Sequence, residues 1–194
     1  MMVDLSRYNR GDYDPGRGPI VRSLWFFVGL PLLRAALNPS TAVRVWLLRL
    51  FGAKVGRGTT MKPGMRVKYP WRLKVGDFAW IGEDAWIDNL ALVSVGNNAV
   101  ISQGAYLCTG NHDWARETFD LRTGPILLED GSWVGARAFV GPNVVLERCA
   151  VAAAGSVVTR SIPAFEIHAG NPATFVKHRV VAGDSWVAVS KGAV

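Results

Sequence analysis

The chain has 194 residues, 49% of them hydrophobic, and a formal net charge of +7. This length and apolar content are sufficient for a substantial core, which excludes a disordered chain and predicts one folded unit with an N-terminal attachment. The two cysteines, Cys108 and Cys149, match no metal-ligand spacing and form no disulfide framework, so a reducing, cytoplasmic environment is expected.

Positive charge is concentrated towards the N-terminus. Residues 1–74 carry 14 Lys or Arg against three acids, whereas residues 75–194 carry 8 against 12. The apolar run at 24–33 is too short to span a bilayer, which takes ~20 residues, and it lies too far along the chain for a secretory signal. After the helix-start signal NPST at 38–41, the sequence AVRVWLLRLFG predicts an amphipathic helix that ends at Gly52.

Residues 1–52 therefore form a separate, partly helical segment, and two interpretations of it stay open. Its helices cap the open end of the repeat region that follows, or its Trp, Phe, Leu and Arg side chains attach it peripherally to the inner face of an anionic membrane. The two roles are compatible. Nucleic-acid binding is not expected, because the basic residues are interleaved with large aliphatic residues and no recognition motif is present.

From Val55 to about Thr159 the sequence repeats a six-residue unit: an aliphatic residue, usually a Gly, two turn-prone residues, a small residue and one more. Copies read VGRGTT, VGDFAW, IGEDAW, VGNNAV, ISQGAY, VGARAF and VGPNVV. A β-sandwich is disfavoured, since its strands recur every ~8 to 12 residues. A period of six instead predicts an all-β parallel solenoid in which each hexad is one side of a triangular coil.

The repeat assigns each position a place in the coil. The aliphatic positions are expected to point inward and stack: Val55, Met61, Val67, Val75, Ile81, Ile87, Val95, Ile101, Leu107, Leu128, Val134, Val140, Leu146 and Val158. The third place after each aliphatic holds residues that tolerate the left-handed backbone of a sharp corner: Gly58, Gly64, Asp84, Asn98, Gly104, Asn143 and Gly155. Arg137 and Cys149 break this corner pattern.

One excursion interrupts the repeat. The register stops after Leu107 and resumes at Leu128, and the segment between them reads CTGNHDWARETFDLRTGPIL. The expected organisation is thus a β-helix body of about five coils at 53–162, an inserted loop at 108–126, and a short C-terminal extension at 163–194.

Six ordered motifs carry a specific resemblance: LLRLFGAKVG, YPWRLKVGDFAWIG, VISQGAYLCTGNHD, PILLEDGSWVG, SVVTRSIP and AGNPA. Over about residues 45–180 the chain resembles the colanic acid biosynthesis acetyltransferase family of the hexapeptide-repeat acyltransferases. The galactoside, maltose and nodulation O-acetyltransferases are more distant relatives. The resemblance implies a homotrimer of left-handed parallel β-helices, with acetyl-CoA in the groove between subunits and a sugar hydroxyl as the acetyl acceptor.

His112 is the candidate catalytic residue. A sugar hydroxyl is a poor nucleophile at neutral pH, so a base that removes its proton accelerates attack on the thioester. His112 lies in TGNHD, where a loop leaves a rigid scaffold, and such loops commonly carry catalytic groups. Its neighbours Asn111 and Asp113 are candidate orienting residues, and either Asp113 or a backbone carbonyl is expected to fix the imidazole tautomer.

Further site residues follow from the resemblance. Asp88 and Asn89, about one coil before the base, are candidates for orienting the acceptor hydroxyl, with corner packing as an equal alternative. The residues assigned to CoA are Trp133, Ala136, Ala154, Thr159, Arg160, Lys177 and Arg179. Small residues let the pantetheine arm approach the backbone, and basic residues meet the nucleotide phosphates. Trp133 also fits a purely structural role against the loop.

Other chemistries are less well supported. A thioester on Cys108 conflicts with its position in the repeat. A zinc site of the γ-type carbonic anhydrase kind is not expected, since His168 and His178 lie beyond the repeat body and leave His112 alone on it. Acetyl transfer to an amino sugar and a non-catalytic assembly module remain alternatives to the preferred function, acetyl-CoA-dependent O-acetylation of a sugar in polysaccharide biosynthesis.

Overall fold

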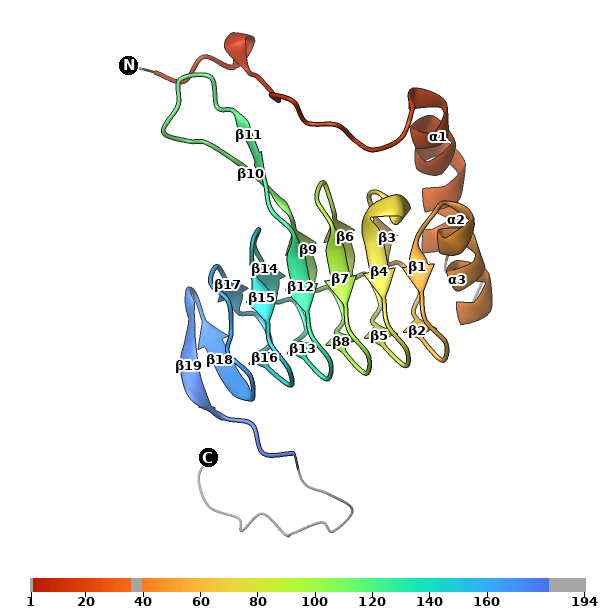
Figure 1. Cartoon of the computed structure of the whole chain (residues 1–194), viewed down its shortest axis with the longest axis vertical. Coiled ribbons are helices and arrows are strands. Elements are labelled where there is room, and N and C mark those ends of the chain that lie inside the picture. Colours follow the sequence, from red (N-terminus) through yellow and green to blue (C-terminus); the bar gives the residue numbers. More distant parts are fainter. Residues whose placement is uncertain (1, 36–39, 182–194) are drawn as a thin grey trace.

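The computed structural model describes residues 2–35 and 40–181, and in them the repeat region winds into a parallel β-solenoid with three faces (Figure 1). Sheet 1 contains β1 (Lys54–Val55), β4 (Leu73–Val75), β7 (Val93–Val95), β12 (Ile126–Leu128) and β15 (Val145–Leu146). Sheet 2 contains β2 (Thr60–Met61), β5 (Trp80–Ile81), β8 (Val100–Ile101), β13 (Trp133–Val134), β16 (Val151–Ala152), β18 (Glu166–Gly170) and the antiparallel β19 (Ala173–His178). Sheet 3 contains β3 (Arg66–Val67), β6 (Trp86–Asp88), β9 (Tyr106–Cys108), β14 (Phe139–Val140) and β17 (Val157–Val158).

The parallel solenoid is therefore confirmed, with a small correction to its length. The three sheets give five complete coils, and β18 pairs in parallel with β16 to begin another turn. The stack thus has about six turns rather than about five. The predicted inward aliphatic positions are buried, apart from the half-buried Val55 in the first coil.

The corners have the expected left-handed backbone, including the two whose residues, Arg137 and Cys149, break the sequence pattern. Asp84, Asn98 and Asn143 have φ angles of 56°, 53° and 61°. Arg137 and Cys149 adopt the same conformation, with φ angles of 57° and 58°. Their backbone N–H groups donate to carbonyl oxygens on the preceding coil, at Gln103 and Asp130, over 2.9 Å in both cases. The stacking of the coils therefore fixes the corner, even where the side chain does not favour it.

Helices cover the end of the solenoid at β1. A continuous helix, which we call the N-terminal helix, runs through α1 (Pro19–Leu24), the π-helical turn η2 (Trp25–Gly29) and α2 (Leu30–Arg34). The predicted helix before Gly52 is confirmed as α3 (Thr41–Leu50), although the start signal at 38–41 falls partly outside the described residues. Buried Trp25 anchors the N-terminal helix, because its indole N–H donates to the Val67 carbonyl of β3 over 3.0 Å. Within residues 2–35 and 40–181, no helix is both long and apolar enough to cross a membrane.

The segment before these helices reaches across the molecule to the inserted excursion. It contains the 3₁₀ turn η1 (Leu5–Arg7) and runs along the upper edge of the solenoid in Figure 1. The Asp4 N–H donates to the Glu117 carbonyl over 2.9 Å, and the Leu121 N–H donates to the Asn9 carbonyl over 3.2 Å. The two parts of the chain are thereby joined.

Candidate functional site

The inserted excursion forms an antiparallel hairpin that projects from the solenoid (Figure 1). Its strands are β10 (Gly110–His112) and β11 (Leu121–Thr123), and His112 pairs with Leu121 at the outer end of the ladder. The hairpin leaves the coil directly after β9 of sheet 3 and returns at β12 of sheet 1. The break in the repeat therefore places His112 beyond the packed body, on two paired strands.

The His112 ring is held in one orientation by Phe119. The His112 Nδ1 lies 3.1 Å from the Phe119 carbonyl oxygen, and the two rings stack with centroids 4.4 Å apart and planes 8° apart. The Tyr8 ring, from the N-terminal segment, lies 5.8 Å from the imidazole. A carbonyl oxygen can only accept, so Nδ1 carries the hydrogen in the neutral imidazole. Nε2 then carries the lone pair, and no protein group in the described part of the chain hydrogen-bonds to it.

Asp113 does not orient the imidazole; of the two alternatives, the carbonyl does so. The Asp113 carboxylate lies 2.5 Å from Arg122 Nη2 and 3.4 Å from Arg116 Nε. Arg116 also pairs with Asp120 at 2.9 Å. Hydrogen bonds from Thr118, and then from Arg116, lower the pKa of Asp120 below its usual value. Asp113 thus belongs to a charge network that closes the tip of the hairpin.

Asn111 lies on β10 beside His112, whereas Asp88 lies at the base of the hairpin. The exposed Asn111 side chain accepts from the His112 N–H over 2.8 Å. Asp88 ends β6, and its backbone carbonyl accepts from the Thr109 N–H over 3.2 Å, at the base of the hairpin. The Asp88 carboxylate lies 2.9 Å from Lys68 Nζ. Of the predicted acceptor pair, Asp88 is thus the residue whose carboxylate is partly exposed, and its acceptor role stays a prediction.

Asn89 has a structural role instead of the predicted acceptor role. Its side chain is completely buried. The Asn89 carboxamide accepts from the Tyr69 N–H over 2.8 Å and donates to the Tyr69 carbonyl over 2.7 Å. Both ends of the amide are thus used to join two neighbouring coils, and corner packing is the alternative that the structure supports.

The Cys108 thiol hydrogen-bonds to Gly110 and Tyr106 rather than to His112. Its thiol donates to the Gly110 carbonyl over 3.2 Å and accepts from the Tyr106 hydroxyl over 3.3 Å. Burial, followed by the hydrogen bond to Cys108, raises the pKa of Tyr106 well above its usual value. The phenol therefore remains protonated and keeps its hydrogen bond to Cys108 beside the base of the hairpin.

Four of the residues assigned to CoA fall on two corners of the solenoid. Ala136 and Ala154 occupy the same corner in successive coils, where the Gly155 N–H donates to the Ala136 carbonyl over 2.8 Å. Exposed Thr159 and Arg160 follow β17, so they lie at the edge of sheet 3 from which the hairpin also leaves. The structure thus brings the residues of each pair together and places the second pair on the same edge as the hairpin.

The remaining CoA candidates differ in their exposure and in the hydrogen bonds that their side chains already make. Trp133 is 44% exposed on β13, and its indole N–H donates to the Ser102 hydroxyl over 2.8 Å. Lys177 is exposed on β19. The Arg179 guanidinium donates to the carbonyl oxygens of Gly131 and Cys149 over 2.8 and 3.2 Å. These bonds use Nη1 of Arg179, and its predicted contact with a phosphate stays a prediction.

The other histidines lie at the far end of the solenoid. His168 Nε2 is 2.7 Å from the Glu166 carboxylate, and the His178 ring lies 5.1 Å from the Phe175 ring. Among the described residues, no three His, Cys, Asp or Glu side chains are grouped so that they could hold a metal ion.

Sequence reasoning missed an aromatic ladder on the outer face of sheet 3. The Arg66 guanidinium lies 5.4 Å from the centre of the Trp86 ring, which stacks on Tyr106 at 4.4 Å. Tyr106 in turn meets Phe139 edge to face at 5.5 Å. The signal in the sequence is an aromatic residue at the last position of the hexads IGEDAW, ISQGAY and VGARAF. The ladder forms a continuous surface next to Asp88.

Comparison with known proteins gives close and distant relatives. WcaF of Escherichia coli, named as a colanic acid biosynthesis acetyltransferase, is 36% identical over 179 residues, which cover 92% of this chain and 98% of the relative. Galactoside O-acetyltransferase of the same organism is 25% identical over 134 residues, 68% of this chain and 66% of the relative. No protein-family model matches the chain.

Solved structures agree with the fold. A hexapeptide-repeat acetyltransferase of Vibrio cholerae, in complex with acetyl coenzyme A, superposes with a TM-score of 0.77 and 22% identity over 91% of this chain and 97% of that one. Galactoside acetyltransferase in complex with coenzyme A has a TM-score of 0.72 and 22% identity over 82% of this chain and 81% of that one. At these identities the likeness concerns the fold alone.

Proposed function

Because the chain belongs to the colanic acid biosynthesis acetyltransferase family of hexapeptide-repeat acetyltransferases, we propose that it transfers the acetyl group of acetyl-CoA directly to a sugar hydroxyl in polysaccharide biosynthesis. The observation that carries the proposal is the fixed imidazole of His112. Its Nδ1 is held by the Phe119 carbonyl, which leaves the lone pair of Nε2 for a substrate.

The mechanism uses His112 as general base and then as general acid. Nε2 takes the hydroxyl proton while the sugar oxygen attacks the thioester carbonyl carbon and forms a tetrahedral oxyanion. The carbon–sulfur bond then breaks, and the imidazolium returns the proton to the CoA sulfur. A positioned base of this kind accelerates the reaction by roughly a hundred- to ten-thousandfold. No covalent enzyme intermediate is needed, which agrees with the engaged thiol of Cys108.

For the co-substrate, we assign the corner formed by Ala136 and Ala154 to the pantetheine arm and Arg160 to the phosphates. The alanines allow a close approach to the backbone, and the exposed guanidinium is a strong partner for phosphate. Trp133 is the further candidate contact on sheet 2. We propose a homotrimer in which the CoA groove lies between subunits.

We also propose that residues 1–52 both cap the solenoid and attach it peripherally to an anionic membrane on the cytoplasmic side. The N-terminal helix exposes 83% of Ile20 and 72% of Phe27, and α3 exposes 60% of Trp46 and 62% of Leu50. Apolar side chains on basic helices favour the interface of anionic lipids. Flotation of the full chain and of a Phe27→Ser/Trp46→Ser variant with phosphatidylglycerol vesicles tests this role, and equal flotation of both would contradict it.

The proposed chemistry is tested by thiol release from acetyl-CoA with a panel of sugars, lipid-linked sugars and amino sugars. We expect His112→Ala to lower kcat by roughly a hundred- to ten-thousandfold and His178→Ala, the matched control at the far end, to leave it unchanged. Lability of the product to hydroxylamine distinguishes an ester from an amide. Full turnover by His112→Ala would overturn the mechanism, and an amide product would overturn O-transfer.

A further inference from the structure

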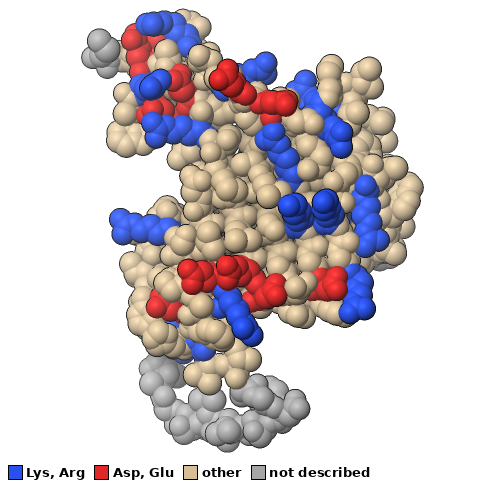
Figure 2. All heavy atoms as spheres, in the orientation of Figure 1, with Lys and Arg blue, Asp and Glu red and all other residues tan. Residues whose placement is uncertain are grey.

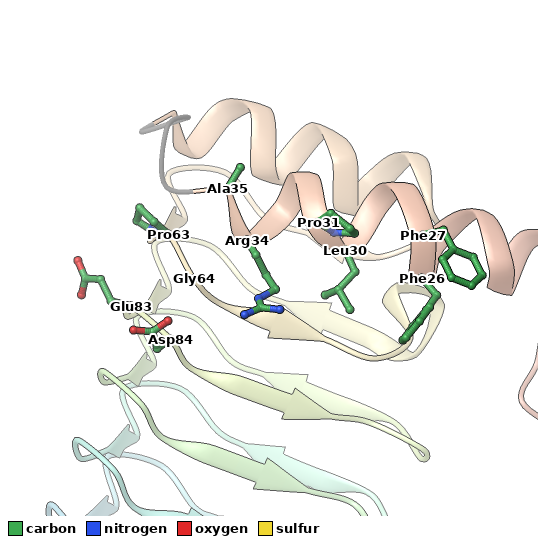
Figure 3. Close-up of a pocket in the computed structure, with 10 residues that line it drawn as sticks. All are labelled: Phe26, Phe27, Leu30, Pro31, Arg34, Ala35, Pro63, Gly64, Glu83 and Asp84. Carbon is green, nitrogen blue, oxygen red and sulfur yellow. The ribbon is translucent and has the colours of Figure 1, made fainter.

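A cleft of about 650 Å³ lies between the N-terminal helix and strands β3 and β6 of sheet 3; we call it the helix cleft. An adjoining cavity of about 760 Å³ shares four of its residues. Figure 3 shows this cavity, with Phe26, Leu30 and Arg34 pointing from the helix towards the strands. The two spaces form one continuous recess under the helix. None of the residues assigned to CoA lines either space.

The walls of the helix cleft are strongly cationic. Arg22, Arg34, Arg66 and Lys68 line it, and Asp88 is its single carboxylate. No Asp or Glu occurs between Asp14 and Asp77, an interval with twelve Lys or Arg residues. Figure 2 shows the resulting gathering of basic side chains over the first coils, whereas acidic side chains form a band lower on the solenoid.

Two of these cations have donors that lack a partner. The Nε atoms of Arg22 and Arg66 are buried and make no hydrogen bond with the residues that the structure describes. A buried donor without a partner costs about 1 to 3 kcal/mol, more for a charged group, so the site gains when an acceptor binds. A phosphate oxygen forms short, charge-assisted hydrogen bonds with guanidinium groups. The interior of the cleft is therefore suited to an anion.

The outer part of the recess is apolar. Phe26 is 61% exposed and Phe27 72% exposed, and both line the cleft as well as the adjoining cavity. Leu30, Pro31 and Pro63 continue this surface in the adjoining cavity, whose opposite end holds Glu83 and Asp84 (Figure 3). A ligand that contacts the Phe26 and Phe27 rings as well as the cations of the helix cleft is consequently amphipathic, with a hydrocarbon part next to a phosphate part.

The recess extends along strand β6. The adjoining cavity includes Asp84 at the corner before the strand, and the helix cleft includes Trp86 within the strand and Asp88 at its end. The Asp88 carbonyl is bonded to Thr109 at the base of the hairpin that carries His112. The helix cleft therefore reaches the base of the hairpin that carries His112.

We propose that the helix cleft binds the carrier of the acceptor: a saccharide joined through phosphate to a hydrocarbon chain. The chain lies along Phe26 and Phe27, the phosphate lies against Arg22 and Arg66, and the sugar is directed past Asp88 towards the hairpin. This inference rests on the proposed sugar acetylation and names its substrate class. It also gives the exposed apolar helix a role in receiving a substrate from the membrane surface.

The test is calorimetric binding to the full chain, without acetyl-CoA, of decyl phosphate below its micellar concentration. Decyl maltoside and glucose 1-phosphate are the matched probes that lack the phosphate and the hydrocarbon chain. We expect decyl phosphate to bind about tenfold or more tightly than either probe, and Arg66→Gln and Arg22→Gln each to weaken it by about ten- to hundredfold. Arg57→Gln is the control, because Arg57 also lies over an aromatic ring, Phe78, at 5.7 Å but outside the cleft.

Equal binding of decyl phosphate and decyl maltoside, or unchanged binding by both cleft variants, would overturn the inference. In the transfer assay, joining the best free saccharide to decyl diphosphate is expected to raise kcat/KM about tenfold in the wild type but not in Arg66→Gln. Efficient acetylation of free sugars without binding of decyl phosphate would refute the cleft and leave the proposed function intact. Tight binding of decyl phosphate through Arg66, with no acetyl transfer to any acceptor, would refute the proposed function alone.

Discussion

Replacing Asn89 with alanine separates a structural role from a role in acceptor binding. The Asn89 side chain is completely buried, and its carboxamide makes two hydrogen bonds with the backbone of Tyr69 on the preceding coil, over 2.8 and 2.7 Å. Each such bond contributes about 0.5 to 1.5 kcal/mol, and a backbone group left without a partner costs about 1 to 3 kcal/mol. We therefore expect Asn89→Ala to lower the free energy of unfolding by about 2 to 4 kcal/mol.

Urea unfolding followed by tryptophan fluorescence measures this change, and thermal unfolding should show a midpoint lowered by roughly 4 to 16 °C. Asn97→Ala is the matched control. The Asn97 amide also makes two hydrogen bonds, to the Asp77 N–H over 2.8 Å and to the Asp130 carboxylate over 3.2 Å. Because Asn97 is exposed, water replaces both bonds, and we expect a loss of about 1 kcal/mol or less.

The kinetic parameters complete the comparison. If Asn89 only joins two coils, the KM for the acceptor measured well below the unfolding temperature should stay within about twofold of the wild-type value. Wild-type stability together with an acceptor KM raised about tenfold would refute the reasoning and return Asn89 to the acceptor site.

Three further outcomes are expected. Cys108→Ser should keep at least about half of the wild-type kcat and show no burst of thiol release, whereas a covalent thioester would make the variant inactive. Gly29→Ala should destabilise the protein by about 1 to 2 kcal/mol in thermal unfolding. A Cβ at this position clashes with the Trp25 ring, and the strain outweighs a helix-propensity gain of about 1 kcal/mol. A stabilised variant would contradict this. The Thr118 hydrogen bond lowers the pKa of Asp120, so it stabilises the hairpin above the usual Asp pKa of about 3.9. This stabilisation is lost as the pH falls through the lower pKa of the folded state. Hydrogen exchange of β10 and β11 should therefore accelerate in that acid range in the wild type but not in Asp120→Asn.

The solenoid could be predicted because its determinants repeat locally. Every sixth residue must fit the interior of a narrow coil, so burial selects an aliphatic side chain at positions such as Ile81, Ile101 and Val134. The sharp corners select residues that tolerate positive φ, as at Asn98. The excursion that carries His112 was equally visible, since a regular register shows where it stops.

The same local reasoning failed where contacts between distant segments decide the outcome. Arg137 adopts a corner conformation because its N–H bonds to the preceding coil, and the long side chain of Arg179 reaches the carbonyls of Gly131 and Cys149. Both contacts depend on which corners the coils place above one another. A sequence pattern assigns a residue to a corner, but it does not identify the partner that the corner meets.

For this protein, the sequence alone determined the repeat, the fold, the family resemblance and the candidate base. Only the tertiary structure decided that the Phe119 carbonyl, rather than Asp113, holds the imidazole, and that Tyr8 from the N-terminal segment lies 5.8 Å from the His112 ring. It also revealed the helix cleft, whose walls come from a helix and from strands of two coils. The physical reason is that periodic burial is written into neighbouring residues, whereas hydrogen-bond partners and cavities arise from segments that meet only when the chain has folded.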